Sequence, residues 1–359
     1  MTRTWLALSV AGLLLVSSPR SSFAPACCPV PPPGKAVVNA DQTVIIVWDA
    51  ASKTQHFIRQ ASFKSEADDF GFLVPTPTQP DLAESGNEAF PFLAKVTAPA
   101  KQQRPRPPHS SFGCGEEPET KSAASVHVLA DKLVAGLQAV VLETKSADAL
   151  VRWLKEHGYA FSPEVEAWAK PYVEAGWKIT ALRVAKGRAA GDQRIAASAL
   201  RMTFKTERPL FPYREPDPKK AAKTLDAQHR LLRIYFLAEA RYGGERSNHG
   251  AWSGKVAWAN KLTAEQRART LELLKIPETK TPSECWLTEF EDDWSYKGAP
   301  ADVNFLRAPH QDTVVREPII EYVSSPWPSD PAVYAFVALI VLNPILRRSR
   351  RSRPLQMSP

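Results

Sequence analysis

The sequence predicts an α+β fold of mostly antiparallel strands with a helical pair at about 146–176, set between an N-terminal signal peptide and a C-terminal transmembrane helix. Three observations predict it. Short runs of alternating polar and apolar residues, bounded by turn residues, indicate strands on both sides of residues 146–176. Inside that range the apolar residues recur at helical spacing. Both chain ends carry apolar segments typical of membrane targeting.

The N-terminus has the three parts of a secretion signal. Arg3 supplies a positive charge, Trp5 to Val16 an apolar core, and Ala24-Pro25-Ala26 the small residues required for cleavage before Cys27. The apolar run is too short to span a bilayer. A lipoprotein signal, in which Cys27 becomes lipidated, is the alternative, although alanine occupies the position where such signals usually have leucine. We therefore expect residues 1–26 to be removed and the rest to be exported.

The exported part, residues 27–325, begins with a predicted hairpin. Residues 43–48 and 54–61 read as its strands, joined by a turn at 49–52, and residues 70–74 as a third strand. In the second strand His56 alternates with its apolar neighbours, which predicts that it lies on the exposed face. Residues 97–123 are rich in Pro, Ser and charge, and we expect a flexible, solvated loop there.

The helical pair has clear start and stop signals. Ser146 can cap the first helix and Gly158 can end it, while Ser162-Pro163-Glu164 begins the second and Gly176 stops it. Pro171 should kink the second helix or split off its last turn. The flanking strands are predicted from period-two patterns, at 137–143 before the pair and at 177 onward, 200–205 and 230–240 after it.

The C-terminal segment is predicted to anchor the chain in a membrane. Residues 331–346 are apolar and would form roughly 24 Å of helix, short against a hydrocarbon core of about 30 Å. Trp327 sits where an interfacial aromatic belongs, and the basic tail 347–359 obeys the positive-inside rule through Arg347, Arg348, Arg350, Arg351 and Arg353. A tail removed by a sorting enzyme is the alternative. Either way, the partner implied is the membrane.

The net charge of +8 belongs to these targeting segments. Arg3, Arg20 and the five tail arginines account for seven of the 46 basic residues, which leaves 39 basic residues against 38 acidic ones. The exported part is thus nearly neutral and lacks the basic surface that nucleic-acid binding requires.

The four cysteines, Cys27, Cys28, Cys114 and Cys285, can form disulfides after export, with three pairings open. A ring between the adjacent Cys27 and Cys28 would be strained, so one or both should reach Cys114 or Cys285. No CxxC, haem or zinc spacing is present, and the sequence predicts neither a metal nor another cofactor.

Two other groups of residues suggest sites. Cys285 with His229 or His249 and the acidic run 289–293 could serve a thiol or carboxylate hydrolase, although Glu289 and Glu291 also fit the polar face of a strand. Trp252 and Trp258 lie among Gly, Ser and Asn without helical or strand spacing. They could form a platform for glycans or peptides, although packing in the core is the favoured reading. Gly243-Gly244 reads as a turn.

Several segments together resemble a bacterial family, the domain of unknown function 2330 (DUF2330). They are the run 146–154 with His157-Gly158-Tyr159, the segment 171–177, Phe70 to Pro77, Leu210-Phe211-Pro212-Tyr213 and residues 234–238. The resemblance spans roughly residues 27–325 and implies the exported architecture, but no catalytic residues. We therefore expect a membrane-tethered extracytoplasmic module that binds or scaffolds an envelope protein or glycan, with an exported hydrolase as the alternative.

Overall fold

The computed structural model describes residues 28–30, 37–39, 42–60, 63–65, 71–105, 132–144, 146–159, 163–184, 198–216, 229–295 and 301–323. It divides the chain into two compact units, one made of residues 1–97 and 123–315 and the other of residues 98–122 and 316–359. The predicted signal peptide, membrane helix 331–346 and basic tail lie outside the described residues. Within the described ranges, no helix has the length and apolar character needed to cross a bilayer.

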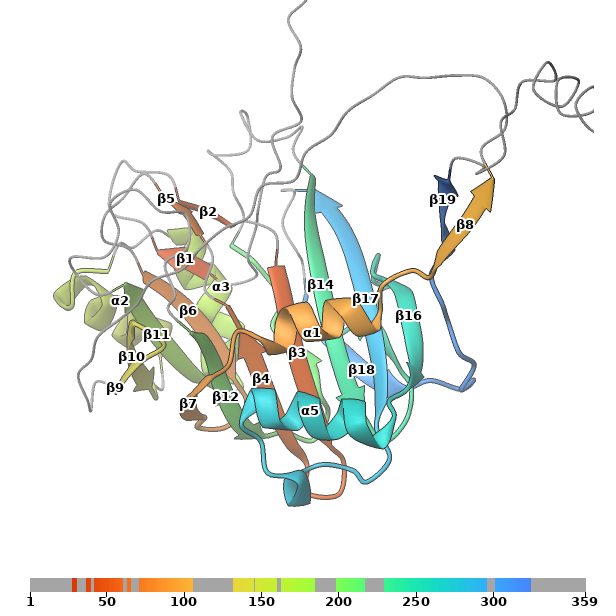
Figure 1. The fold of residues 1–359 in the computed structure, drawn as a ribbon. Coiled ribbons are helices and arrows are strands. Elements are labelled where there is room, and N and C mark those ends of the chain that lie inside the picture. The colour runs from red at the N-terminus through yellow and green to blue at the C-terminus, as the bar shows by residue number, and fades with distance from the viewer. Residues whose placement is uncertain are drawn as a thin grey trace, which may run out of the picture. The chain divides into compact units, whose positions relative to one another are not determined.

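The first unit is built on a seven-stranded sheet with the strand order β16-β17-β14-β3-β4-β12-β7 (Figure 1). Neighbouring strands are antiparallel except β14 and β3, which are parallel. The β3–β4 turn is closed by Asp49, whose Oδ1 accepts a hydrogen bond from Ala51 N at 3.0 Å. In sheet order, the strands are Lys255–Lys261, Trp286–Ser295, His229–Ala238, Gln42–Asp49, Thr54–Arg59, Ala199–Lys205 and Asp81–Ser85.

Further antiparallel sheets belong to the same unit. A five-stranded sheet has the order β1-β6-β11-β10-β9 and a three-stranded sheet the order β13-β18-β15, while β2 pairs with β5. The five strands are Cys28–Val30, Gly71–Thr76, Lys178–Val184, Leu137–Leu142 and Lys132–Val134. The others are Leu210–Phe211, Val303–Arg307 and Tyr242–Arg246, then Val37–Asn39 and Phe63–Ser65.

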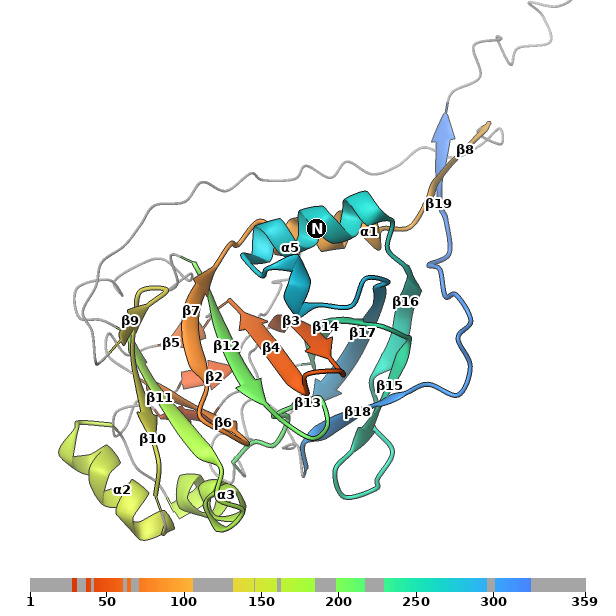
Figure 2. The same ribbon diagram turned by 90° about the horizontal axis from the view of Figure 1, so that it is seen from below.

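Helices cover the outer faces of the sheets (Figure 2). Helices α1 (Ala89–Val96) and α5 (Ala264–Leu274) pack on one face of the seven-stranded sheet, and the short 3-10 helix η1 (Glu278–Lys280) follows α5. Helices α2 (Ala147–Glu156) and α3 (Pro163–Glu174) pack on the five-stranded sheet. The resulting order of layers is helices, large sheet, smaller sheets and helices.

The main core lies between the large sheet and the smaller sheets. Val44, Ile46 and Phe236 point into this interior, whereas Ile45 and Val47 point to α1 and α5. Because the central strands are buried on both faces, they read as continuous apolar runs rather than as alternating ones. We call the side toward the smaller sheets the inner face and the side toward α1 and α5 the helix face.

The predicted α+β class with mostly antiparallel strands is confirmed, and so are both helices of the 146–176 pair. Ser146 caps α2 by accepting a hydrogen bond from Ala149 N at 3.2 Å. Gly158 and Gly176 follow the two helices with φ of +74° and +72°, a conformation that favours glycine. The last turn is not split off at Pro171, because α3 continues to Glu174.

The second unit contains a parallel pair of strands, β8 (Lys101–Pro105) and β19 (Ile319–Val323). Lys101 Nζ and Glu321 Oε1 form an ion pair at 2.6 Å between them. The prediction of a continuous loop over 97–123 is therefore wrong for residues 101–105, and residues 106–122 lie outside the described residues.

His56 corrects a second expectation, because it is buried and not exposed. It lies on the helix face of β4, opposite Val47, and its Nδ1 forms a 2.9 Å hydrogen bond with Thr203 Oγ1. The alternation of His56 with apolar residues did not imply that His56 is exposed, because helices cover the helix face of the sheet. The pKa of His56 is lowered to about 4, mainly by burial and also by the positive charges of Arg201 and Lys280, while the charge of Asp49 opposes these effects.

The buried His56 should make the protein less stable in acid. The pKa of His56 is about 4 in the folded protein and about 6.5 when unfolded, so its contribution is fully present above pH 6.5 and is lost as the pH falls toward 4. The loss amounts to about 3 kcal/mol. Denaturant unfolding at pH 7 and pH 4 should show a smaller acid penalty for His56→Gln than for the parent. The exposed His310→Gln serves as the control and should behave like the parent; equal penalties for all three proteins would contradict the assignment.

Candidate functional site

The segment Leu210-Phe211-Pro212-Tyr213-Arg214, which begins as strand β13 of the three-stranded sheet and packs in the main core, positions the candidate site. The side chain of Gln55 holds its first residue at both backbone groups, accepting from Leu210 N and donating to Leu210 O at 2.8 Å each. Strand β13 pairs with β18, and Phe211 packs in the main core. After Pro212, Tyr213 and Arg214 each bind a buried aspartate.

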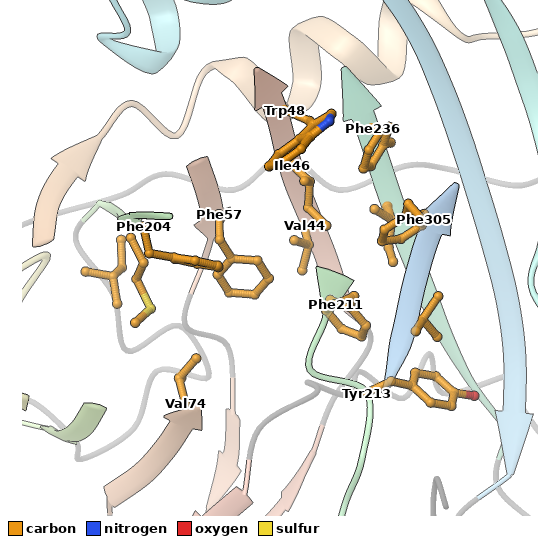
Figure 3. Close-up of a cluster of buried hydrophobic side chains, with 14 of the residues drawn as sticks. Val44, Ile46, Trp48, Phe57, Val74, Phe204, Phe211, Tyr213, Phe236 and Phe305 are labelled. Carbon is orange, nitrogen blue, oxygen red and sulfur yellow. The ribbon is translucent and has the colours of Figure 1, made fainter. Parts of the chain in front are cut away.

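Asp292 is the first of these aspartates. It lies on the inner face of β17 and is 1% exposed. Its Oδ2 accepts hydrogen bonds from the Tyr213 hydroxyl at 2.7 Å and from Trp252 Nε1 at 2.9 Å. Figure 3 shows Tyr213 at the end of the apolar cluster, with its hydroxyl pointing away from Phe211. Burial, together with the negative charge of Asp292, raises the pKa of Tyr213 well above its usual range, so the phenol remains a donor.

Asp302 is the second buried aspartate and lies just before β18. Its Oδ1 accepts from the Tyr172 hydroxyl at 2.8 Å and from Arg214 N at 3.0 Å. Burial raises the pKa of Asp302, and these two donors oppose the rise. Because Trp168 Nε1 donates to Arg214 O at 2.9 Å, the same segment also ties α3 to the three-stranded sheet. Asp302 therefore has a structural role.

Trp252 is held between two glycines beside Asp292. A Cβ added at Gly244 would lie 2.3 Å from Trp252 Cε3, and one added at Gly254 would lie 2.4 Å from its Cζ2. The indole also contacts Phe290, with ring centroids 5.5 Å apart. Gly243-Gly244 is part of strand β15 and not a turn, and its second glycine leaves room for the indole.

The structure does not bring Trp252 and Trp258 together. Trp252 packs against the main core, whereas Trp258 is buried in the cluster on the helix face of the sheet. The two indoles therefore do not form the common platform considered from the sequence. Strand β16 has an irregular register between Val256 and Trp258. Because of this irregularity, the spacing of the two tryptophans in the sequence does not indicate that they lie on opposite faces of the large sheet.

Gln42 completes the candidate site. Leu232 pairs with Asp292 on one side and with Gln42 on the other, so all three share the inner face. Gln42 is 5% exposed, and neither atom of its amide has a hydrogen-bond partner among the described residues. The Oδ1 atom of Asp292 lacks a partner in the same part of the chain. An open carboxylate oxygen and an open amide thus lie on either side of one leucine. The sequence analysis included Asp292 only as a member of the acidic run 289–293 and did not identify Gln42.

The thiol proposed as a nucleophile is not arranged for catalysis. Cys285 is a free cysteine, 4% exposed, and burial raises its pKa to about 12. The β14–β17 register places His229 opposite Ser295, at the far end of β17 from Cys285 and roughly 30 Å along the strand. His249 lies in an exposed turn after β15.

The acidic run is a strand, but Glu289 is not on a solvated face. It is 1% exposed on the helix face, and its Oε1 pairs with Arg233 Nε at 2.8 Å. Arg233 Nη2 also pairs with Glu291 Oε1 at 2.7 Å. One guanidinium therefore binds both carboxylates, and the pair has the character of a structural ion network rather than of an acid and a base.

The remaining predicted residues lie largely outside the described part. Cys28 is in β1, and Cys285 has a free thiol instead of the expected disulfide. No group of three or more His, Cys, Asp or Glu residues suited to a metal ion occurs in the ranges that the structure covers. The residues outside these ranges are Cys27, Cys114, Trp327, Arg347, Arg348, Arg350 and Arg351.

Comparisons with known proteins yield one family. The model of the family described as "Uncharacterized protein conserved in bacteria (DUF2330)" matches residues 21–306. The comparison with curated proteins gives no match. Among solved structures, the crystal structure of baculovirus P35 aligns with 82% of this chain and 100% of that chain, at 11% identity and a TM-score of 0.37.

Because Gly244 lies against the Trp252 indole and Gly243 does not, substituting alanine at these two adjacent glycines should have very different effects on stability. Gly244→Ala should destabilise the protein by about 1–3 kcal/mol, because the new methyl group overlaps the indole and also approaches Val303. Gly243→Ala is the matched control, since its added Cβ meets nothing within 4 Å. Denaturant unfolding of both variants checks this. Equal losses of stability at the two positions would mean that the indole is not held here.

The burial of Cys285 predicts an unreactive thiol. Iodoacetamide should leave Cys285 unmodified in the native protein at pH 8 and alkylate it fully in denaturant, because the reactive thiolate is suppressed by its raised pKa and the sulfur is shielded. Mass spectrometry of the peptide that contains Cys285 measures the modified fraction. Rapid alkylation in the native state would restore the thiol-enzyme hypothesis.

Proposed function

This chain belongs to the family described as "Uncharacterized protein conserved in bacteria (DUF2330)", and we propose that it acts as a membrane-tethered, extracytoplasmic binding module of the cell envelope. The observation that carries the proposal is that Asp292 Oδ1 and the Gln42 amide, neighbours on the inner face, have no hydrogen-bond partner among the described residues. A buried polar atom without a partner costs about 1–3 kcal/mol. A bound ligand that completes these hydrogen bonds would offset that cost.

The described residues favour binding over hydrolysis. The thiol of Cys285 is buried and its pKa is raised, while Glu289 and Glu291 are both paired with Arg233. Asp292 has an open oxygen, but its neighbours Tyr213 and Trp252 are hydrogen-bond donors and not bases. An acceptor held by two fixed donors suits recognition of a ligand better than proton transfer.

The sequence supports the location. A signal of the type seen at residues 1–26 directs export, and an apolar segment followed by five arginines holds the C-terminus in the membrane with its basic tail in the cytoplasm. The folded part would then face the periplasm or the extracellular space, where it can meet small molecules of the envelope.

Native mass spectrometry of the full chain, purified in detergent from its host, tests the binding function. The wild-type protein should carry a small-molecule mass that is lost on denaturation, and Gln42→Leu should lack it. In its ligand-free form the Leu variant should also be more stable than the parent by about 1–3 kcal/mol, because an unpartnered amide is replaced by an apolar group.

Thr288→Val is the matched control. Thr288 lies on the same face of β17 as Asp292, is fully buried, and its hydroxyl also lacks a partner among the described residues. This variant should keep the bound mass. A wild-type protein without any bound small molecule, or equal loss of the mass in both variants, would contradict the proposal that Gln42 binds a ligand.

A further inference from the structure

We propose that the ligand of this interior site is an organic ammonium ion, held by its N–H groups between Asp292 and Gln42. The inference rests on the binding function proposed above and adds the chemical class of the ligand. It follows from the charge, the aromatic surroundings and the spacing of the described residues.

The first argument is the unbalanced charge of Asp292. Both of its bound donors, Tyr213 and Trp252, are neutral and share the single oxygen Oδ2. The other buried acids differ in having a positive charge nearby: Glu289 pairs with Arg233, and the charge of Arg214 opposes the rise in the pKa of Asp302. No cationic side chain of the described residues pairs with Asp292. A buried carboxylate without a cation is costly, so a positively charged ligand is favoured over a neutral or anionic one.

The second argument is the aromatic surroundings of that carboxylate. Tyr213 and Trp252 meet edge to face with centroids 6.3 Å apart, and Phe290 lies two residues before Asp292 on the same face of β17. Aromatic rings attract cations through their negative faces, and the attraction grows as the cation loses water. A carboxylate beside several aromatic rings is an arrangement suited to an alkylammonium group.

The third argument is the position of Gln42. Two strand spacings separate it from Asp292, roughly 10 Å between Cα atoms, with only Leu232 between them. We assign one N–H group of the ligand to Asp292 Oδ1 and another to Gln42 Oε1, the two acceptors that lack partners among the described residues. A metal ion would need more anionic ligands than the single carboxylate that this part of the sheet offers.

The test uses the full chain in detergent, freed of bound small molecules by denaturation and refolding, with ethanolamine hydrochloride and ethylene glycol as probes at equal ionic strength. These two molecules have nearly the same size, but only the first is a cation. Calorimetric titration should show binding of ethanolamine and binding of ethylene glycol at least about tenfold weaker. Asp292→Asn should weaken ethanolamine binding by about tenfold to a hundredfold, because a charged acceptor is replaced by a neutral amide.

Asp293→Asn is the matched control, because Asp293 is the next residue on β17, is exposed and points to the face opposite Asp292; this variant should bind ethanolamine as the parent does. If Asp292→Asn fails to fold, Gln42→Leu gives the second measurement and should weaken binding by about tenfold. Equal binding of both probes, or ethanolamine binding unchanged in both site variants, would overturn the ammonium assignment. A neutral or anionic small molecule found in the native mass experiment would overturn it as well while leaving the binding function intact.

Discussion

The arrangement of the first unit depends on the burial of two aspartates that are bound by consecutive residues of one short segment. Tyr213 donates its hydroxyl to Asp292, and Arg214 donates its backbone N–H to Asp302. Asp292 belongs to the large sheet and Asp302 leads into the three-stranded sheet, while Trp168 and Tyr172 of α3 bind to the same segment and to the same Asp302. A carboxylate cannot be buried without donors, so each aspartate fixes the distance between the layers that supply them. The side chain of Gln55 sets the register of the segment before it reaches either acid.

This dependence explains why the two aspartates have different roles. Asp302 collects donors from a helix and from the connecting segment, and its own carbonyl accepts from Ser247 N at 2.7 Å, so its surroundings are complete. Asp292 receives donors on Oδ2 alone. The glycines at 244 and 254 allow the Trp252 indole to approach it closely, and the Tyr213 phenol is fixed by its backbone connection to the Asp302 site. The donors around Asp292 are therefore fixed by the fold, and for the proposed ligand this preorganisation would lower the entropy lost on binding.

Local signals in the sequence predicted the elements well and the site poorly. Ser146, Pro163, Gly158 and Gly176 act within one turn of a helix, so α2 and α3 could be placed without knowledge of the rest of the chain. Helix α5 carries an equally local signal, the capping box between Thr263 and Gln266, in which each side chain binds the other residue's backbone. The burial of His56 was beyond such reasoning, because it depends on a helix more than 200 residues away in sequence that covers an ordinary-looking strand.

The acidic run of β17 shows why the period of the sequence alone could not predict the site. Glu289, Glu291 and Asp293 share one phase of the strand, and Asp292 falls on the other phase together with Phe290. An acid on the apolar phase is a readable sign of a buried carboxylate, but its partners come from segments about 40 and 80 residues away, which no local pattern connects. The role of Gln42 was harder still to predict, because Gln42 begins an apolar strand and the parallel neighbour of that strand, β14, lies far along the chain. Selection for stability alone would favour an apolar side chain at a position where a buried amide has no partner. Among the described residues, the Gln42 amide and Asp292 Oδ1 are open on the same face of the sheet, and the recognition proposed above, of a molecule with N–H donors, would satisfy both at once.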